Sequence, residues 1–421
     1  MTQDYVRWTG ARNPRWLATN FKSPTLPFQG WQKFKEAFAP EVVARAIRES
    51  PNDVRTIVDP FGGSGTSALT AQFLGCKPIT SEVNPYLADV IEAKLTSYNL
   101  NKLKLAVKDF SQFAQKVSDF APTADIGNLP RTFVEPGKNE RWLFSRELYD
   151  FLQALISHTL RYDPAERRLL QTSIGGDLLS ISNARVSGKG RRYRSNWSSR
   201  QTTRQEALAT VLSSVEDATG DIATHGNRPE PSFRLIRGDS RQTITEIDQT
   251  DLVIFSPPYP NSFDYTDVYN IELWMLGYLD KQKNQDLRKS TLSSHVQIFR
   301  NFEAAPTESK VLNDTLNGLT ASEVRLWSNH IPAMIGGYFA DMLLIMTNSR
   351  NLLPSKGQLW MVVGDSRYAG IDIPVADILV ELALASNWQV AQVEPLRSMR
   401  TAPQQGGRAE LPESLIVLQK P

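Results

Sequence analysis

Residues 256–259 read Ser-Pro-Pro-Tyr and follow a predicted strand at 251–255, whose last four residues are apolar. The two prolines end a strand and stiffen the loop, since each fixes φ and neither donates a backbone hydrogen bond. The Ser256 hydroxyl and the Pro257 carbonyl can then stand together as acceptors beside the aromatic face of Tyr259. Two acceptors orient both hydrogens of an amino group, and an aromatic ring stacks on a base that has left its helix. This pattern suits group transfer to a nucleobase amino group, which depends on alignment rather than on a strong nucleophile or a metal. An ordinary proline-rich turn is the alternative.

A second candidate site lies at 56–66, where Thr-Ile-Val-Asp-Pro-Phe-Gly-Gly-Ser-Gly-Thr runs from a predicted strand into a predicted helix. Its glycines permit a tight turn and a close approach of the backbone to a ligand, and the helix amino terminus presents unpaired N–H groups. The spacing departs from G-x-G-x-x-G and lacks the Lys-Ser/Thr of a phosphate-binding loop. Asp59, at the strand end, suits a cationic amino-acid group better than a pyrophosphate. S-adenosylmethionine carries such an ammonium group and a sulfonium, so we expect it as the cofactor. A glycine turn that binds nothing is the alternative.

Two further acidic residues follow predicted strands at the same edge of the sheet. Glu82 comes directly after the strand at 77–81, where an acidic residue commonly binds ribose hydroxyls in doubly wound folds. Asp239 follows the strand at 233–237 and can accept a hydrogen bond from an adenine amino group. A solvated glutamate and a simple turn or helix cap are the alternatives.

The elements that must position these residues alternate between short apolar runs and helical patterns. This alternation is typical of a mainly parallel sheet covered by helices on both faces. Strands are predicted at 54–58, 77–81, 233–237, 251–255, 358–363, 388–393 and 414–419, and helices at 64–74, 85–95 and 375–385. The predicted fold class is therefore α/β, with a doubly wound, mainly parallel, Rossmann-like sheet of seven strands.

The uneven spacing of these strands indicates insertions. Roughly 150 residues separate the second strand from the third, whereas a crossover needs only a dozen or more. We expect residues 1–100 to form an amino-terminal strap and the cofactor-binding half of the core. A mostly helical insert is expected at 101–232, and the catalytic half at 233–421 with a smaller insertion near 280–330.

Composition excludes several other classes of protein. The 421 residues carry a net charge of +2, so nucleic-acid binding cannot be argued from bulk charge. The single cysteine, Cys76, rules out an internal disulfide and a cysteine-rich zinc site. The four histidines lack metal-ligand spacing and are expected at the surface or at helix caps. Without a leader pattern or an apolar run of ~20 residues, we expect a cytoplasmic protein with no membrane span. From the cysteine and histidine positions we also expect no bound metal.

A local basic cluster offers the nucleic-acid contacts that bulk charge does not. Between 185 and 204 the chain has seven basic residues and no acidic one, with Tyr193 and Trp197 interleaved. Basic side chains contact phosphates, while aromatic rings and guanidinium planes stack on bases. The predicted nucleic-acid contacts are Lys189, Arg191, Arg192, Arg194 and Arg200. A solvated basic loop is the alternative.

Together, the two motifs resemble those of the amino-methylating DNA methyltransferases, the N4-cytosine and N6-adenine class. That family binds S-adenosylmethionine on an Asp-Pro-Phe-x-Gly-x-Gly-Thr loop, here 59–66, and has an (Asp/Asn/Ser)-Pro-Pro-(Tyr/Phe) catalytic loop, here 256–259. Serine in the first position resembles the N4-cytosine branch. The stretch 34–41 resembles the family's segment before the glycine loop, which implies that Phe38 and Pro40 lie near the methionine end of the cofactor. The family's target-recognition region, which reads DNA, would fall in the insert.

The resemblance covers roughly 30–100 and 233–421 and implies a site-specific, S-adenosylmethionine-dependent DNA methyltransferase that modifies cytosine N4. The predicted catalytic residues are Ser256, Pro257, Pro258 and Tyr259. The predicted cofactor-binding residues are Phe38, Asp59, Pro60, Phe61, Gly62, Gly63, Gly65, Thr66, Glu82, Asn84, Asp239 and Ser240. Adenine-N6 methylation of DNA, amino-methylation of an RNA base and a catalytically silent DNA-binding partner subunit remain as alternatives, with RNA less expected than DNA. The sequence does not fix the oligomeric state, nor distinguish restriction–modification from another defence role or regulation.

Overall fold

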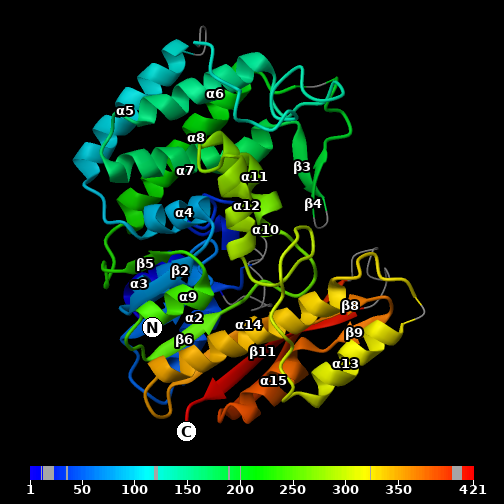
Figure 1. The fold of residues 1–421 in the computed structure, drawn as a ribbon. Helices are drawn as coiled ribbons and strands as arrows, with labels where there is room; N and C mark the ends of the chain where they lie inside the picture. Colours follow the sequence, from blue (N-terminus) through cyan, green and yellow to red (C-terminus); the bar gives the residue numbers. More distant parts are fainter. Residues whose placement is uncertain are drawn as a thin grey trace.

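A seven-stranded sheet lies in the lower part of the molecule in Figure 1. This computed structural model describes residues 1–10, 12, 23–34, 37–117, 122–187, 190–199, 201–322, 324–400 and 410–421. The strands of the sheet are β1 (Thr56–Asp59), β2 (Lys77–Glu82), β5 (Arg234–Arg237), β6 (Leu252–Phe255), β7 (Gln358–Gly364), β10 (Gln389–Arg400) and β11 (Glu410–Gln419). All seven predicted strands are therefore present, and only the last two differ from their predicted ends by more than a few residues.

The order of the strands is β10-β11-β7-β6-β1-β2-β5. The strands from β7 to β5 are parallel, while β11 runs antiparallel to both of its neighbours. The chain passes outward from β1 through β2 to β5 and then returns to β6 on the other side of β1. Doubly wound sheets bind ligands at such a reversal, because the loops on its two sides diverge. The predicted doubly wound, mainly parallel fold is confirmed.

β10 and β11 are longer than predicted because they pair with each other as a hairpin. Two register irregularities, between Val390 and Gln392 and between Pro395 and Arg397, interrupt this pairing without ending it. The predicted strand ends at Val393, the last of its apolar residues, whereas the ladder continues to Arg400. Hydrophobicity alone therefore placed the end of this strand too early.

Alternate residues of the central strands point to two buried faces, as a parallel sheet covered on both sides requires. Val58 and Val253 pack on one face, and Ile57 and Leu252 pack on the other. The first face is covered by α13 (Lys310–Ala321), α14 (Ile331–Leu352) and α15 (Val375–Ala385), and the second by α2 (Pro40–Glu49) and α3 (Thr66–Leu74).

α14 is long and apolar enough to cross a membrane by length and composition alone. It packs in the apolar cluster on the first face of the sheet, and 61% of its most apolar stretch is buried inside the protein. Such burial is typical of a core helix.

Helices between α4 (Pro85–Leu95) and β5 form the upper part of the molecule in Figure 1. These elements are α5 (Leu100–Val117), α6 (Arg146–Thr159), α7 (Pro164–Ile181), α8 (Arg204–His225) and a hairpin of β3 (Ala184–Ser187) and β4 (Gly190–Tyr193). Their apolar cluster also takes in Tyr86 of α4 and Tyr269 and Trp274 from the segment after β6. Because residues on both sides of the predicted boundaries share this cluster, the division into domains stays a prediction.

The remaining elements are short. They are α1 (Gln3–Thr9), η1 (Ser23–Thr25), α9 (Ser240–Thr243), η2 (Ile244–Glu246), α10 (Tyr265–Val268), α11 (Asn270–Met275), α12 (Lys281–Ser290), β8 (Ser366–Tyr368) and β9 (Ile371–Ile373). α12 and α13 occupy the stretch near 280–330 in which a smaller insertion is predicted. α10 and α11 connect the sheet to the upper helices, since β4 contacts α10 and α7 contacts α11.

Substitution of two glycines tests how tightly the upper helices pack on the core. A Cβ on Gly175 of α7 would meet the buried ring of Tyr86 at 2.5 Å, so Gly175→Ala should lower the free energy of unfolding by roughly 1–3 kcal/mol. Gly220 of α8 has nothing within 4 Å of the same position, so Gly220→Ala should raise it by roughly 0.5–1 kcal/mol. Thermal unfolding measures both, and equal shifts would contradict tight packing of α7 on α4.

Candidate active site at the carboxyl edge of the sheet

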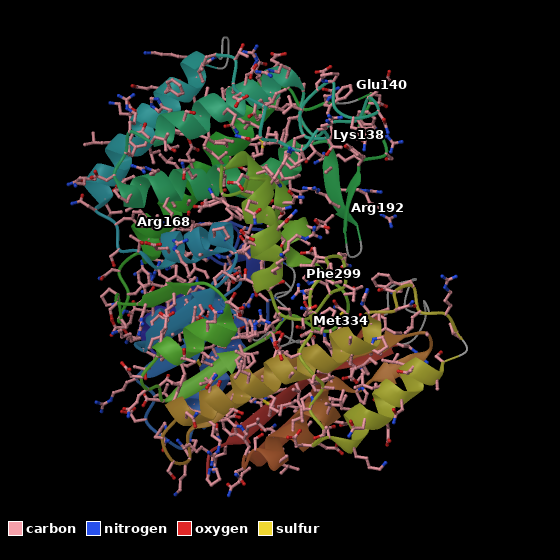
Figure 2. The ribbon with its side chains drawn as sticks, viewed as in Figure 1. Lys138, Glu140, Arg168, Arg192, Phe299 and Met334 are labelled. Carbon is pink, nitrogen blue, oxygen red and sulfur yellow. The ribbon has the colours of Figure 1, made fainter. Side chains whose placement is uncertain are left out.

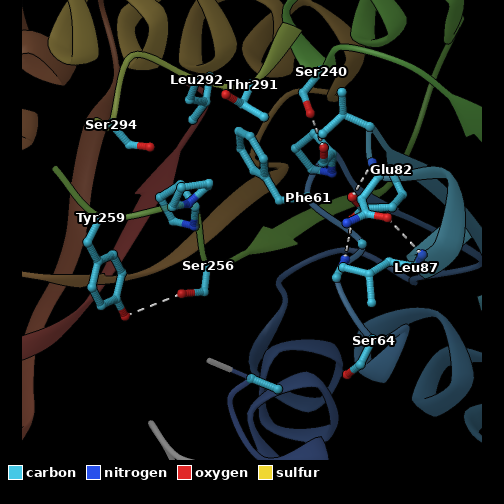
Figure 3. A pocket seen from close by; sticks show the side chains of 18 of the residues that line it. Phe61, Ser64, Glu82, Leu87, Ser240, Ser256, Tyr259, Thr291, Leu292 and Ser294 are labelled. Atoms are coloured by element: carbon cyan, nitrogen blue, oxygen red, sulfur yellow. Dashed lines mark hydrogen bonds between the residues drawn. The ribbon is translucent and has the colours of Figure 1, made fainter. Parts of the chain in front are cut away.

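A cavity of about 490 Å³ opens where β1, β2, β5 and β6 end, and its size is typical of small-molecule sites. Figure 3 shows Phe61 and Glu82 on one part of its wall and Ser256 and Tyr259 on another. The predicted site residues that line it are Phe38, Asp59, Pro60, Phe61, Gly62, Gly63, Thr66, Glu82, Asn84, Asp239, Ser240, Ser256, Pro257, Pro258 and Tyr259. Gly65 is the predicted cofactor residue that does not line it. Two motifs far apart in the chain therefore meet in one site.

The turn between β1 and α3 depends on three glycines. The Gly62 N–H donates to the Ser81 carbonyl oxygen at 2.8 Å, and a Cβ on Gly62 would lie 2.5 Å from Thr80 Oγ1. Gly63 and Gly65 have φ angles of 54° and 82°, in the left-handed region that favours glycine. Gly65 is also the N-cap of α3, so it shapes the turn without lining the cavity.

Lys94 of α4 holds this turn from behind. Its side chain is fully buried, and Nζ donates to the Ser64 carbonyl oxygen at 2.7 Å. Burial lowers the pKa of Lys94 to about 7, so the ammonium loses its proton readily near neutral pH. This role could not be predicted, because a lysine in a helical pattern is ordinarily solvated and its partner is 30 positions away.

Asp59 and Glu82 are buried acids, and no lysine or arginine of the described part of the chain pairs with either. The Phe61 N–H donates to Asp59 Oδ1 at 2.9 Å. The N–H groups of Gly63 and Asn84 donate to Glu82 at 2.7 and 2.8 Å. Burial raises the pKa of Asp59 to about 6 and that of Glu82 to about 7, although these hydrogen bonds act in the opposite direction. Such acids favour a ligand with positive charge or hydroxyl donors.

Asp239 lines the cavity with a carboxylate that Arg241 already engages. Asp239 accepts the backbone N–H of Arg241 at 3.0 Å and its Nη2 at 2.6 Å. Nη1 of Arg241 donates to both oxygens of buried Asp341 at 3.2 Å, and Asp341 also accepts the N–H of Ser293 at 2.9 Å. This network ties the end of β5 to α14, and an adenine amino group at Asp239 would share its acceptor with arginine.

The Ser-Pro-Pro-Tyr loop, which is the predicted catalytic loop, is braced by the hairpin of β10 and β11. Ser256 Oγ lies 3.3 Å from the Tyr259 hydroxyl, which donates to Glu413 Oε1 at 2.7 Å; Figure 3 shows the first of these contacts. Glu413 is 3% exposed, and Nε of Arg397 donates to its second oxygen. The sequence did not reveal Glu413 or Arg397, because Glu413 lies 154 positions beyond Tyr259 and only strand pairing brings it to the loop.

The segment 291–295 forms a further wall of the cavity, and Figure 3 shows Thr291, Leu292 and Ser294 there. His295 is 1% exposed, so the expected surface or capping position is wrong for this histidine. Its Nε2 lies 3.1 Å from Arg300 Nη2, and burial lowers its pKa to about 4. Because arginine only donates, Nε2 accepts and Nδ1 carries the proton of the neutral ring. Within the described ranges, no group of three or more His, Cys, Asp or Glu side chains could hold a metal.

The basic hairpin of β3 and β4 borders the site, because β4 contacts α10, which follows the Ser-Pro-Pro-Tyr loop. Arg192 is exposed, and Figure 2 shows it on the hairpin. Arg191 is half-buried over the Phe133 ring, with its guanidinium carbon 5.9 Å from the ring centroid. Burial lowers the pKa of Arg191 below its usual range, against the opposing effect of Glu272 and Asp267.

The other predicted nucleic-acid contacts are placed differently. Arg194 Nη2 donates to the Ser180 carbonyl oxygen at 2.6 Å and its Nε to that of Ala184 at 3.1 Å, so this guanidinium binds backbone near the end of α7. Lys189 and Arg200 lie outside the described residues. The nucleic-acid role of the hairpin stays a prediction.

The raised pKa of Glu82 makes stability depend on pH. Because this carboxyl titrates at about 7 when folded and at 4.5 ordinarily, the folded chain binds more protons between these values. Stability therefore falls as pH rises from about 4.5 to 7, by about 1.4 kcal/mol for each unit of pKa difference. Glu82→Gln should reduce this fall in a series of melting temperatures against pH. The same change at exposed Glu303 should leave the series unaltered, and equal curves for Glu82→Gln and the parent would contradict the assignment.

Comparison with known proteins places these features in context. No family model matches the chain. The type II methyltransferase M.BsoBI of Geobacillus stearothermophilus is 26% identical over 93% of this chain and 85% of its own length. M.AvaI, a type II methyltransferase of Anabaena variabilis, is 26% identical over 94% and 87%.

Shorter or weaker similarities add little. The type II methyltransferase M.MjaII of Methanocaldococcus jannaschii is 28% identical over 23% of this chain. Among solved structures, the rRNA methyltransferase AviRa of Streptomyces viridochromogenes is 10% identical over 91% of this chain and 85% of that one, with a TM-score of 0.31, too low to bear on the fold. The chain is thus similar to type II methyltransferases along more than nine-tenths of its length, and both of its motifs lie in one cavity of a Rossmann-like sheet.

Proposed function

We propose that this protein transfers a methyl group from S-adenosylmethionine to the exocyclic N4 amino group of cytosine at a specific site in DNA. The observation that carries the proposal is the single cavity that joins the glycine turn after β1 to the Ser-Pro-Pro-Tyr loop after β6. A donor and an acceptor react efficiently only when one site holds both in the right orientation. The type II methyltransferase relatives support this reaction class, and serine in the first position of the tetrapeptide supports cytosine over adenine.

The residues that follow β1 and β2 fit S-adenosylmethionine. Asp59 would bind its ammonium group and Glu82 its ribose hydroxyls, because both acids are buried, lack a basic partner in the described ranges and line the cavity. Gly62 and Gly63 line the cavity, and a Cβ at either position would collide with Thr80 or Phe34. Phe38 adds an apolar surface beside Asp59. When bound, the cofactor supplies a methyl group on a positively charged sulfur.

The catalytic loop would hold the target base. The Ser256 hydroxyl and the Pro257 carbonyl accept the two amino hydrogens, which leaves the nitrogen lone pair directed at the methyl group. The Tyr259 ring stacks on the base, and its hydrogen bond to Glu413 restricts rotation of that ring before the substrate arrives. Such preorganisation is the main source of rate when neither a nucleophile nor an acid is needed.

DNA contacts in this proposal come from the hairpin of β3 and β4. We assign phosphate contact to exposed Arg192, since the guanidinium of Arg194 binds backbone carbonyls and that of Arg191 is half-buried over Phe133. The contact of β4 with α10 places this hairpin beside the loop that would hold the target base.

A transfer assay tests the proposed reaction. Purified protein is incubated with labelled S-adenosylmethionine and either unmethylated genomic DNA or total RNA, and the nucleosides are separated by mass spectrometry. We expect N4-methylcytosine in DNA. N6-methyladenine in DNA would mean that the target base is adenine, and label confined to RNA would mean that the substrate is RNA. Cofactor binding without any label would favour a catalytically silent partner subunit.

Two substitutions separate cofactor binding from transfer. Asp59→Ala should weaken cofactor binding by roughly ten- to hundredfold, because it removes an ionic hydrogen-bond acceptor. Ser256→Ala should reduce kcat on the order of a hundredfold with little change in cofactor affinity, because it removes one of two acceptors for the amino group. Calorimetric titration and single-turnover rates provide the two readouts. Ser213→Ala, at an exposed position of α8, is the matched control, and equal loss of cofactor binding in Ser256→Ala would contradict its role.

A further inference from the structure

Phe299 is the most exposed large apolar side chain of the described residues, at 81%. It lies in the connection between α12 and α13, after the segment 291–295 that forms part of the cavity wall. Single exposed apolar side chains are common on protein surfaces, so the exposure by itself has no functional meaning. What distinguishes Phe299 is how its neighbours are held.

The residues on both sides of Phe299 are anchored to the site. Arg300 donates from Nη1 to the carbonyl oxygens of Thr291 and Leu292 at 2.8 and 3.0 Å, and from Nη2 to that of Arg288 at 2.9 Å. On the other side, Nε2 of Gln297 donates to the carbonyl oxygen of Ser262 at 2.8 Å. The backbone that carries the ring is therefore fixed to the cavity wall, while the ring itself packs against little.

The position of Phe299 is at the boundary of the site. Gln297 binds Ser262, which lies three positions beyond Tyr259, and the Ser262 N–H donates to the carbonyl oxygen of cavity residue Ser294 at 2.9 Å. Figure 2 shows Phe299 between the upper helices and α14, with Arg192 of the hairpin above it. An exposed aromatic ring and an exposed arginine thus belong to two segments that contact residues shortly after the Ser-Pro-Pro-Tyr loop.

A base can enter the cavity only after it leaves the duplex, and its departure breaks stacking on both neighbours. Apolar side chains that enter a base stack can fill such a space. On the basis of the proposed function, we propose that Phe299 enters the duplex and stacks in the place that the target base vacates. Anchorage by Arg300 and Gln297 suits this role, because a backbone that is already fixed loses little conformational freedom when the ring inserts.

The proposal requires that the contribution of Phe299 depends on the pairing of the target base. The protein is compared with Phe299→Ala, Phe299→Trp and the control Leu384→Ala, which alters a 56% exposed side chain of α15 outside the cavity lining. The substrates carry the site found by sequencing methylated DNA, either fully paired, with an abasic site opposite the target, or single-stranded. Phe299→Ala should lower kcat/KM on the paired duplex by roughly ten- to hundredfold and on the other two substrates by less than about threefold. Phe299→Trp and Leu384→Ala should stay within about threefold of the parent on all three.

Each other outcome overturns the proposal in a distinct way. An equal loss of kcat/KM on all three substrates would mean that Phe299 supports the structure of the site. An unaltered kcat/KM on the paired duplex would mean that the ring does not act on DNA. Melting temperature separates misfolding from these outcomes, since a side chain this exposed should be removable without loss of stability. If the parent protein methylates none of the three DNA substrates, the proposed function fails, and the role of Phe299 fails with it.

Discussion

The parallel pairing of β1 with β6 is the constraint on which the candidate site depends. Ile57 and Val58 lie opposite Leu252 and Val253, so the ends of these two strands are adjacent in the sheet although most of the upper helices intervene between them in sequence. The carboxylate of Asp251 fixes this register by accepting the N–H groups of Arg55 and Thr56 at 2.9 and 2.8 Å. A slip of one residue would reverse which side chains face each helical layer. The glycine turn and the Ser-Pro-Pro-Tyr loop would then no longer meet.

The candidate site is stabilised by contacts from the elements that surround it. Lys94 supports the glycine turn from α4, Arg241 connects Asp239 to Asp341, and Glu413 meets the hydroxyl of Tyr259. The Ser64 carbonyl matches the charge of Lys94, the two aspartates match that of Arg241, and Arg397 matches that of Glu413. Asp59 and Glu82 have no opposite charge beside them in the described part of the chain, and this contrast supports the proposal that they bind a ligand.

Sequence reasoning succeeded where the signal was local. Strands such as Leu252–Phe255 are recognisable because they are buried on both faces, and helix α4 begins at Pro85, a residue suited to the first helical turn. The glycine turn and the double proline are contiguous motifs, so their residues could be named before any partner was known. The insert was recognisable because a crossover as long as that between β2 and β5 has to contain elements of its own.

Residues whose roles depend on distant partners could not be found in this way. Glu413 is recognised by its hydrogen bond with the Tyr259 hydroxyl, which only the folded chain brings together. The burial of His295 likewise depends on Arg300 and the neighbouring segments that surround it. Arg194 belongs to a basic cluster in sequence, yet the fold turns its guanidinium to carbonyl oxygens of its own chain. The type of a residue defines which interactions its side chain can make. Its burial and its partners in the fold decide whether it makes them with solvent, protein or ligand.

The position of β11 determines when the sheet can be completed as the chain is synthesised on the ribosome. β11 lies between β7 and β10, although it is synthesised after both. A nascent chain that ends at β10 already contains both motifs, but one edge of β7 is still unpaired and Tyr259 has no Glu413 to meet. Until β11 emerges, this open edge is a site for misassociation that molecular chaperones can cover. The sheet is thus completed in the same step that gives Tyr259 its hydrogen bond to Glu413. An unfinished chain therefore lacks this support for the Ser-Pro-Pro-Tyr loop.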